Sequence, residues 1–222
     1  MKKEKQVVLR TKRLELRPMN IPELERRVVL VPDPEDSKAY AEMLSLSRAH
    51  PEYRLWYTAW AITRKSDGRI LGDLCFKGPA VDGEVEIGYG LEEPYWNQGY
   101  MTEAADALIR WALSQPGVYA VTAQTLPGNL ASQRVLEKLD FHPDGMGEEG
   151  PRFRRERKRS AYILLYMGLG LCLGVAIGTA AAELAVGLCA GGAVGTAMGA
   201  LMDAGERERR SRICGRKSEN NR

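Results

Sequence analysis

The sequence is poor in the residues that build metal centres and disulfide frameworks. Its 222 residues include only two histidines and four cysteines. The cysteines lie far apart, with no CxxC pair among them, at Cys75, Cys172, Cys189 and Cys214. Metal centres need clustered ligands, and disulfide frameworks need regularly spaced cysteines. We therefore expect no metal site and no disulfide network.

Charge is almost absent from one long stretch. Between Ala161 and Met202 the only charged residue is Glu183, whereas the residues before Ala161 mix charged, apolar and turn-forming side chains. The net charge of +3 is small, and much of the basic excess flanks the apolar stretch, so nothing indicates specific nucleic-acid binding. The distribution predicts three parts: a globular domain over 1–158, an apolar segment over 159–202 and a basic, disordered tail over 203–222.

The N-terminus also lacks an apolar run. Charged residues interrupt positions 1–18 throughout, so no segment there has the length and composition of a secretory signal. We therefore expect the globular domain to remain in the cytosol.

Strand and helix signals alternate through the globular part. Apolar and charged residues alternate over Arg13–Arg17, as in a half-buried strand, and Asp67-Gly68 is a typical hairpin turn. On such grounds we expect strands over 13–17, 60–64, 70–77, 84–91 and 119–126, and helices within 21–49 and over 99–114 and 129–139. This order predicts a mixed, mostly antiparallel α/β sheet flanked by helices.

The basic run Arg152–Arg157 has two interpretations. With Phe153 facing inward and the arginines outward, it would be the last strand of the globular domain. Alternatively, the basic cluster Arg152–Arg159 would act with the cluster Arg207–Lys217 and hold an apolar segment at the cytoplasmic face of a membrane. The sequence leaves both interpretations open.

The strand expected over 84–91 has an unusual composition. Because side chains alternate between the two faces of a strand, Glu84, Glu86, Gly88 and Gly90 share one face. Glycine weakens a strand, and one reason to keep it there is close approach of a ligand. Two carboxylates at one end of such a strip could accept a proton from an ammonium substrate. The alternative is a bulge at the glycines, with solvated glutamates.

A turn after this strand leads into a helix. Apolar residues at helical spacing follow Gly99: Ala104, Ala105, Leu108, Ile109 and Ala112. The first N–H groups of a helix lack intrahelical partners and the dipole there is positive, so a pyrophosphate can be held by main chain alone. Gly99 would let such a ligand come near.

Five pieces of sequence occur in the order that one known family has. They are RTKRLELRP, GRILGDLCFKG, EVEIGYGL, YWNQGYMTEAADALIRWAL and NLASQRVLEKLDF, and they span most of residues 1–158. In content and order they resemble the GNAT acetyltransferases, in the branch similar to the ribosomal-protein N-terminal acetyltransferases. The resemblance implies acetyl-CoA as co-substrate, no metal, and a primary amine as acceptor.

The resemblance also implies which residues form the site. The main chain of one strand would bind the pantetheine arm, at Ile87, Gly88, Tyr89, Gly90 and Leu91. The turn amides would hold the pyrophosphate, at Gln98, Gly99, Tyr100, Met101 and Thr102. Asn129 and Ser132 would lie beside the thiol end of the co-substrate. The amine would attack the thioester directly, with Glu86 as the preferred base, Glu84 as the second choice and an N–H near Tyr89 as oxyanion donor.

Four positions depart from the family pattern. Leu136 stands where many relatives have a tyrosine that is the proposed acid, which leaves Ser132 as the candidate. Trp96 and Met101 replace an Arg/Gln and a small residue in the phosphate-binding turn. Asp140 replaces a glycine, and a positive φ there would strain the chain.

Glycines recur every four residues in the apolar segment. They form two helical stripes: Gly170, Gly174 and Gly178, and then Gly187, Gly191, Gly195 and Gly199. Soluble helices rarely keep so many glycines, whereas smooth glycine stripes let membrane helices approach closely. With a turn at Ala182–Leu184, the two arms would be roughly 31 and 27 Å long, close to the hydrocarbon thickness of a bilayer.

We therefore expect a glycine-rich transmembrane helical hairpin over 161–202. Both of its ends would lie in the cytosol, because the basic clusters then fall on one side, and Glu183 would lie at the far surface. The glycine stripes could also join copies of the chain into a homo-oligomer. A low-complexity tail that packs on nothing is the remaining alternative.

Two functions from different classes remain. The first is an N-acetyltransferase tethered to the cytosolic face of a membrane, acting on a protein N-terminus or a small-molecule amine. The second is an acetyl-CoA-binding module of weak catalytic power whose tail anchors and assembles it in a membrane; Trp96, Met101 and Leu136 keep this alternative open. Binding of acetyl-CoA is common to both, so turnover of an amine separates them.

Overall fold

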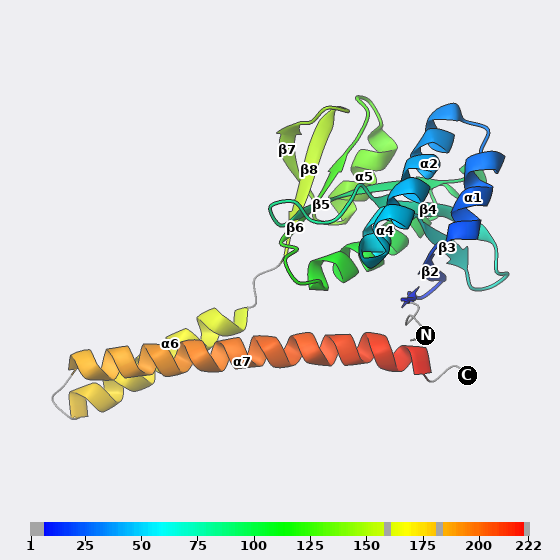
Figure 1. The fold of residues 1–222 in the computed structure, drawn as a ribbon. Coiled ribbons are helices and arrows are strands. Elements are labelled where there is room, and N and C mark those ends of the chain that lie inside the picture. Colours follow the sequence, from blue (N-terminus) through cyan, green and yellow to red (C-terminus); the bar gives the residue numbers. More distant parts are fainter. Residues whose placement is uncertain (1–6, 158–160, 181–183, 220–222) are drawn as a thin grey trace. The chain divides into compact units, whose positions relative to one another are not determined.

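The computed structural model describes residues 7–157, 161–180 and 184–219. The chain divides into two compact units, Met1–Arg157 and Lys158–Arg222 (Figure 1). Residues 158–160, at the expected domain boundary, and 181–183, within the expected turn, lie outside the described residues.

A mixed sheet forms the centre of the first unit (Figure 1). Its eight strands run in the order β1-β2-β3-β4-β5-β6-β8-β7. Their bounds are Leu9–Arg10 (β1), Leu14–Pro18 (β2), Trp60–Arg64 (β3), Ile70–Phe76 (β4), Glu84–Leu91 (β5), Ala120–Gln124 (β6), His142–Met146 (β7) and Pro151–Glu156 (β8). All neighbours are antiparallel except β5 and β6, which run parallel. The expected mixed, mostly antiparallel sheet is confirmed.

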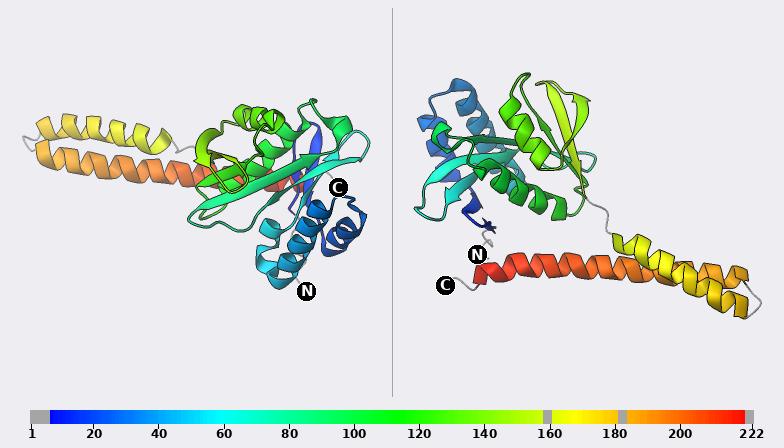
Figure 2. Two further views of the ribbon diagram at one scale, coloured as in Figure 1. Left: turned by 90° about the horizontal axis from the view of Figure 1, so that it is seen from above. Right: turned by 180° about the vertical axis from the view of Figure 1, so that it is seen from behind.

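Helices cover both faces of this sheet. They are α1 (Ile21–Leu30), α2 (Pro34–Ala49), α3 (Arg54–Tyr57), α4 (Tyr100–Ser114) and α5 (Leu130–Lys138), with 3-10 turns at Pro51–Tyr53 and Glu93–Tyr95. The adjacent residues Trp60 and Ala61 point to opposite faces. Trp60 packs in the main core with the apolar side of α4, whereas Ala61 packs with Leu24 of α1 and Met43 of α2. Figure 2 shows α1 and α2, in blue to cyan, across the sheet from α4, in green.

Local signals explain where α2 and β8 begin and what they bury. The helical region breaks between Leu30 and Pro34. Pro34 occupies the first position of α2, and Asp33 caps this helix by accepting a hydrogen bond from the Glu35 amide at 2.8 Å. The basic run Arg152–Arg157 supplies β8, with Phe153 buried, so the strand interpretation is the one the structure has.

The second unit contains two helices, α6 (Ala161–Ala180) and α7 (Leu184–Glu219), which pack against each other. α7 differs from the expectation, because it continues through 203–219, where the sequence predicted a disordered tail. Glutamate and arginine are good helix formers, so the charged residues of this segment can extend the apolar helix that precedes them. Residues 220–222 lie outside the described residues.

Glycines line the contact between α6 and α7. A Cβ added to Gly174 would lie 2.1 Å from the carbonyl oxygen of Gly187, and one added to Gly191 would lie 2.1 Å from that of Gly170. The two backbones therefore approach as closely as glycine alone allows. Large apolar side chains of both helices are exposed: Leu165, Leu169, Leu173, Val175, Ile177, Val186, Leu188, Val194, Met198, Leu201 and Met202.

One segment of the described chain is long and apolar enough to cross a membrane by length and composition. It is Ala185–Met202 in α7, of whose 18 residues only 11% are buried. The apolar part of α6, Leu165–Thr179, is shorter.

Candidate active site

The strands β5 and β6 separate part-way along their length. Their parallel pairing covers three residue pairs, from Glu84 opposite Ala120 to Glu86 opposite Thr122. β5 remains paired with β4 on its other edge as far as Leu91. Beyond Glu86, one edge of β5 therefore has no neighbouring strand, and we refer to this unpaired edge as the opening.

Backbone hydrogen bonds show which groups of β5 face this opening. The Lys77 amide donates to the Glu86 carbonyl at 3.0 Å, and the Glu92 amide donates to the Leu71 carbonyl at 2.9 Å. Main-chain groups alternate between the two edges of a strand, so the even-numbered residues of β5 pair with β4. The odd-numbered residues present their N–H and C=O groups to the opening: Ile87, Tyr89 and Leu91.

A tight turn connects β5 to α4 beside this edge. Asn97 and Gly99 both have a left-handed backbone, with φ of 59° and 74°. Gly99 is the N-cap of α4, and no side chain caps the helix. The amides of the first turn, at Tyr100, Met101 and Thr102, therefore lack both helical and side-chain acceptors in the described part of the chain, as an anion site requires.

The two unusual turn residues leave these amides open. The side chain of Met101 is buried in the core under α4. The indole Nε1 of Trp96 donates to the Leu91 carbonyl at 2.7 Å, which ties the turn to the end of β5. Neither replacement therefore fills the space in front of the helix.

Arg13 contacts the same turn, and this contact was not expected from the sequence. Its Nη1 donates to the Gln98 carbonyl at 3.0 Å, its Nε donates to Glu103 at 2.7 Å, and its guanidinium lies over the Tyr100 ring at 4.3 Å. A Cβ on Gly99 would lie 3.5 Å from its Nη2. A cation therefore stands next to the uncapped amides.

A cleft of about 600 Å³ continues from this turn. Its charged lining consists of four cations, Lys12, Arg110, Lys138 and Arg155, and three carboxylates, Glu103, Asp106 and Asp140. Asp106 pairs with Arg110 at 3.0 Å and with Arg155 at 3.3 Å. Lys12 and Lys138 have no ion pair among the residues that the structure describes. The lining of the cleft therefore contains one more basic than acidic side chain.

The N-terminus of α5 reaches the opening as well. Asn129 caps the helix by accepting a hydrogen bond from the Ser132 amide at 3.0 Å. The Ser132 hydroxyl lies 2.9 Å from the hydroxyl of Tyr89. Burial raises the pKa of Tyr89, and the hydrogen bond with Ser132 offsets part of that rise. The expected role of Tyr89 involved its main chain only, and this pair of hydroxyls was not expected from the sequence.

The two glutamates of β5 have different partners. Glu84 pairs with Arg152 at 2.7 Å and Arg154 at 2.8 Å, both from β8. Glu86 lies 2.6 Å from the Lys77 ammonium and accepts a hydrogen bond from Gln124 Nε2 at 3.0 Å. Glu86 is thus the carboxylate at the point where β5 and β6 separate, whereas Glu84 is held between two arginines.

The remaining candidates have structural surroundings. Leu136 is fully buried in the core under α5. Asp140 has φ of 59°, so the positive φ considered for this position is present. Aspartate tolerates this conformation better than most residues. Within the described residues, no three His, Cys, Asp or Glu side chains are grouped as a metal ion would need.

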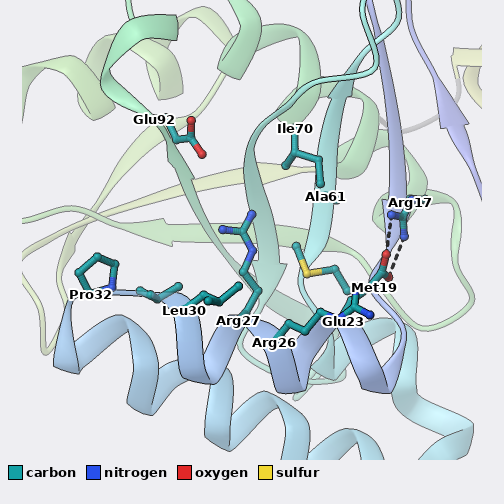
Figure 3. A pocket seen from close by; sticks show the side chains of 11 residues that line it. Arg17, Met19, Glu23, Arg26, Arg27, Leu30, Pro32, Ala61, Ile70 and Glu92 are labelled. Carbon is teal, nitrogen blue, oxygen red and sulfur yellow. Dashed lines mark hydrogen bonds and ion pairs between the residues drawn. The ribbon is translucent and has the colours of Figure 1, made fainter.

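A second pocket lies on the face of the sheet that α1 covers (Figure 3). Its volume is about 530 Å³, and its walls combine arginines, two carboxylates and apolar side chains. Arg17 and Glu23 form a two-bonded ion pair at 2.8 and 2.6 Å at one side. Arg27 projects from α1 toward the strands, and Glu92, two residues beyond Gly90, lies on the opposite side (Figure 3).

Comparison with known proteins identifies the family of this chain. The model of the acetyltransferase (GNAT) domain matches residues 13–142, which include β5, the Gly99 turn and the start of α5. The chain belongs to the GNAT acetyltransferase family. This is a family of acyltransferase enzymes whose fold uses acetyl-CoA, so the acyl-transfer expectation is confirmed at that level.

Relatives and solved structures agree with the GNAT assignment. The uncharacterized N-acetyltransferase YjdG of Bacillus subtilis is 41% identical over 86 residues, which are 38% of this chain and 51% of YjdG. The match thus spans about half the length of that relative. The probable N-acetyltransferase YjcK of the same organism is 26% identical over 162 residues, 64% of this chain and 87% of YjcK.

Among solved structures, the ribosomal L7/L12 α-N-protein acetyltransferase RimL in complex with coenzyme A is similar. Its TM-score is 0.52 at 18% identity, over 67% of this chain and 97% of that chain. At this identity the likeness shows the fold of the first unit.

Proposed function

We propose that this chain transfers an acetyl group from acetyl-CoA to a primary amine, and that the amine attacks the thioester directly. The observation that carries the proposal is the free edge of β5, which ends at the uncapped N-terminus of α4. An extended amide-containing arm and a pyrophosphate are the two ligand parts that such a strand edge and helix start bind.

The parts of acetyl-CoA have candidate partners along this path. The outward main-chain groups of β5 would bind the pantetheine, and the amides from Gln98 to Thr102 would hold the pyrophosphate beside Arg13. Lys12 and Lys138 in the neighbouring cleft are the candidate partners of the further phosphate of the coenzyme. Met101, buried beneath the turn, is compatible with this path.

The reaction needs a base for the ammonium, a donor for the oxyanion and an acid for the thiolate. Glu86 would remove a proton from the ammonium, directly or through a water, while Lys77 and Gln124 hold its carboxylate in place. The Tyr89 amide would stabilise the oxyanion on the thioester carbon. When the C–S bond breaks, the Ser132 hydroxyl, hydrogen-bonded to that of Tyr89, would protonate the thiolate and regain its proton from solvent.

We further propose that the second unit tethers the enzyme to a membrane with the first unit in the cytosol. Three observations support a bilayer over water as its surroundings: the glycine contact between α6 and α7, the exposed apolar side chains of both helices and the apolar length of Ala185–Met202. The glycine contact lies within the chain, and joining of two chains through the same stripes stays a prediction.

Calorimetry and a turnover assay test the proposed reaction. The full chain in mild detergent is titrated with acetyl-CoA, and thiol release is then followed with a panel of peptide N-termini, polyamines, aminoglycosides and small alkyl amines. We expect binding together with turnover of at least one amine, and loss of about 100-fold or more of that turnover in Glu86→Gln.

Two outcomes would contradict parts of this proposal. Binding without turnover of any amine would favour the acetyl-CoA-binding module, which the burial of Leu136 in place of a family tyrosine keeps in view. Unchanged turnover in Glu86→Gln would remove that residue as the base.

A further inference from the structure

Asp73 of β4 has no role in the site expected from the sequence or in the proposed reaction. It is paired in register with Gly90 of β5 on one side and Ala61 of β3 on the other. Its Oδ2 accepts a hydrogen bond from the Tyr40 hydroxyl at 2.5 Å and lies 3.8 Å from an Arg27 nitrogen. Its Oδ1 has no hydrogen-bond partner among the described residues, and 18% of the side chain is exposed to solvent.

The charge of Asp73 is less compensated than those of the two glutamates on the same face. Glu84 has two arginines and Glu86 has a lysine within hydrogen-bond distance. Asp73 has one neutral donor, and Arg27 is beyond hydrogen-bond distance. Burial raises the pKa of Asp73, and Tyr40 and Arg27 offset only part of that rise. A cation that approaches the free oxygen of such a poorly paired, desolvated carboxylate lowers its electrostatic free energy strongly.

There is room for such a cation over Gly90. A Cβ added to Gly90 would meet no heavy atom within 4 Å, whereas one added to Gly88 would lie 3.2 Å from the Cys75 sulfur. The pocket in Figure 3 lies near this place. It is lined by Ala61, the partner of Asp73 on β3, and by Glu92, which lies two residues beyond Gly90. Asp73 and Gly90 are not part of the pocket wall themselves, so the pocket lies beside the pairing of these two residues.

We propose that Asp73 binds the ammonium group of the acceptor over Gly90, and that the acceptors are aliphatic primary amines, cationic at neutral pH, whose chains lie in the pocket of Figure 3. This rests on the proposed acetyl transfer. A compact ammonium with three donors can reach Oδ1 while its fixed neighbours remain, and an arylamine, uncharged at neutral pH, gains nothing from the carboxylate. Asp73 holds R–NH3+, and Glu86 still removes the proton before the nitrogen attacks.

Steady-state kinetics of the full chain in detergent test this proposal. The probes are n-butylammonium and aniline at saturating acetyl-CoA; if another alkyl amine of the panel is the better substrate, inhibition of its acetylation by n-butylammonium is measured. We expect Asp73→Asn to raise the KM or inhibition constant of n-butylammonium about 10- to 100-fold. The kcat should stay within about threefold and the acetyl-CoA affinity should not change, because Glu86 and the α4 turn are untouched.

A matched variant controls for loss of charge alone. Asp36→Asn removes an exposed carboxylate of α2 that also acts on Asp73 through space, and it should leave the KM within about twofold. Asp73→Glu should restore part of the affinity. Equal KM values for wild type and Asp73→Asn, a loss confined to kcat, or aniline acetylated as efficiently as n-butylamine would overturn the proposal.

The wild-type pH profile decides the matter if Asp73→Asn does not fold. The charged groups that face Asp73 are Arg27 on α1, Tyr40 and Asp36 on α2, and Cys75 on its own strand. Because burial raises the pKa of Asp73, this carboxylate loses its charge at a higher pH than an ordinary aspartate does. The KM of n-butylammonium should therefore rise as the pH falls to the raised pKa of Asp73, and a constant KM would overturn the proposal. If wild type acetylates no amine at all, the proposed function fails instead.

Discussion

Glu84 and Glu86 stand two residues apart on one face of β5, yet their carboxylates meet different groups. The partners of Glu84 are two arginines of β8, and those of Glu86 are Lys77 of β4 and Gln124 of β6. A carboxylate held by two guanidinium groups is tied to its strand, whereas one beside the open edge of β5 lies where a substrate proton would be. The order of preference between the two bases thus gains a structural reason.

Glu103 shows how one partly exposed ion pair makes the first unit sensitive to acid. Burial pushes its pKa up, but hydrogen bonds from the Thr11 hydroxyl and from the amide and guanidinium of Arg13 outweigh burial and leave the pKa below its ordinary value. Because the folded pKa is depressed, this stabilisation is present above the unfolded pKa and is lost as the pH falls through the folded pKa.

We expect Glu103→Gln to lower the free energy of unfolding of the first unit by about 1–2 kcal/mol at pH 7. The difference from wild type should begin to shrink near the ordinary glutamate pKa of about 4.3 and should shrink further as the pH falls through the lower folded pKa. Urea titration followed by tryptophan fluorescence measures it, because all four tryptophans lie in the first unit. Glu137→Gln, an exposed helix position, is the control; a Glu103→Gln deficit that persists undiminished at pH 3 would contradict this account.

At the scale of elements, the local sequence pattern predicted whether a segment is a helix or a strand. It did not predict which other elements that segment contacts. β5 was expected over its observed bounds, because its alternation and glycines are local features. β7 was not expected, because His142–Met146 contains proline and glycine and becomes a strand only by pairing with β8. The site divides likewise: the Asn129–Ser132 cap is local, whereas Tyr89–Ser132 and Tyr40–Asp73 join residues 43 and 33 positions apart.

The turn before α4 can be tested with two glycines of like conformation. Gly99 and Gly117 have φ of 74° and 79°, and a Cβ on either would meet nothing closer than 3.5 Å. Alanine should therefore cost about 1–2 kcal/mol of stability at both positions through the backbone alone. Gly99→Ala should also weaken acetyl-CoA binding about tenfold or more, because its methyl group stands among the phosphate-binding amides.

Calorimetry on both glycine variants gives the answer. Gly117→Ala, in the loop after α4, should bind acetyl-CoA with wild-type affinity despite its lower stability. Equal affinities in the two variants would mean that the Gly99 turn does not contact the phosphates.

At the scale of the whole molecule, two units with opposite surfaces share one chain. The first has a buried apolar core against its sheet, whereas the second turns glycines inward and exposes leucine, valine and methionine. In water, exposed apolar area of this extent favours association or insertion, and each leucine or valine that enters hydrocarbon gains free energy. The first unit has the opposite need, since its charged surface must stay hydrated.

We therefore expect the full chain to sediment with membranes, to stay there after washing at high salt and alkaline pH, and to leave only with detergent. A chain that ends at Ser160 should remain in the supernatant and should keep its affinity for acetyl-CoA, because every residue of the proposed site precedes that point. In intact spheroplasts, tags at both ends should resist external protease, since basic clusters flank both ends of the apolar segment. A full chain that stays in the soluble fraction would remove the membrane proposal and leave the acetyl-transfer proposal standing, because the GNAT assignment depends on residues 13–142 alone.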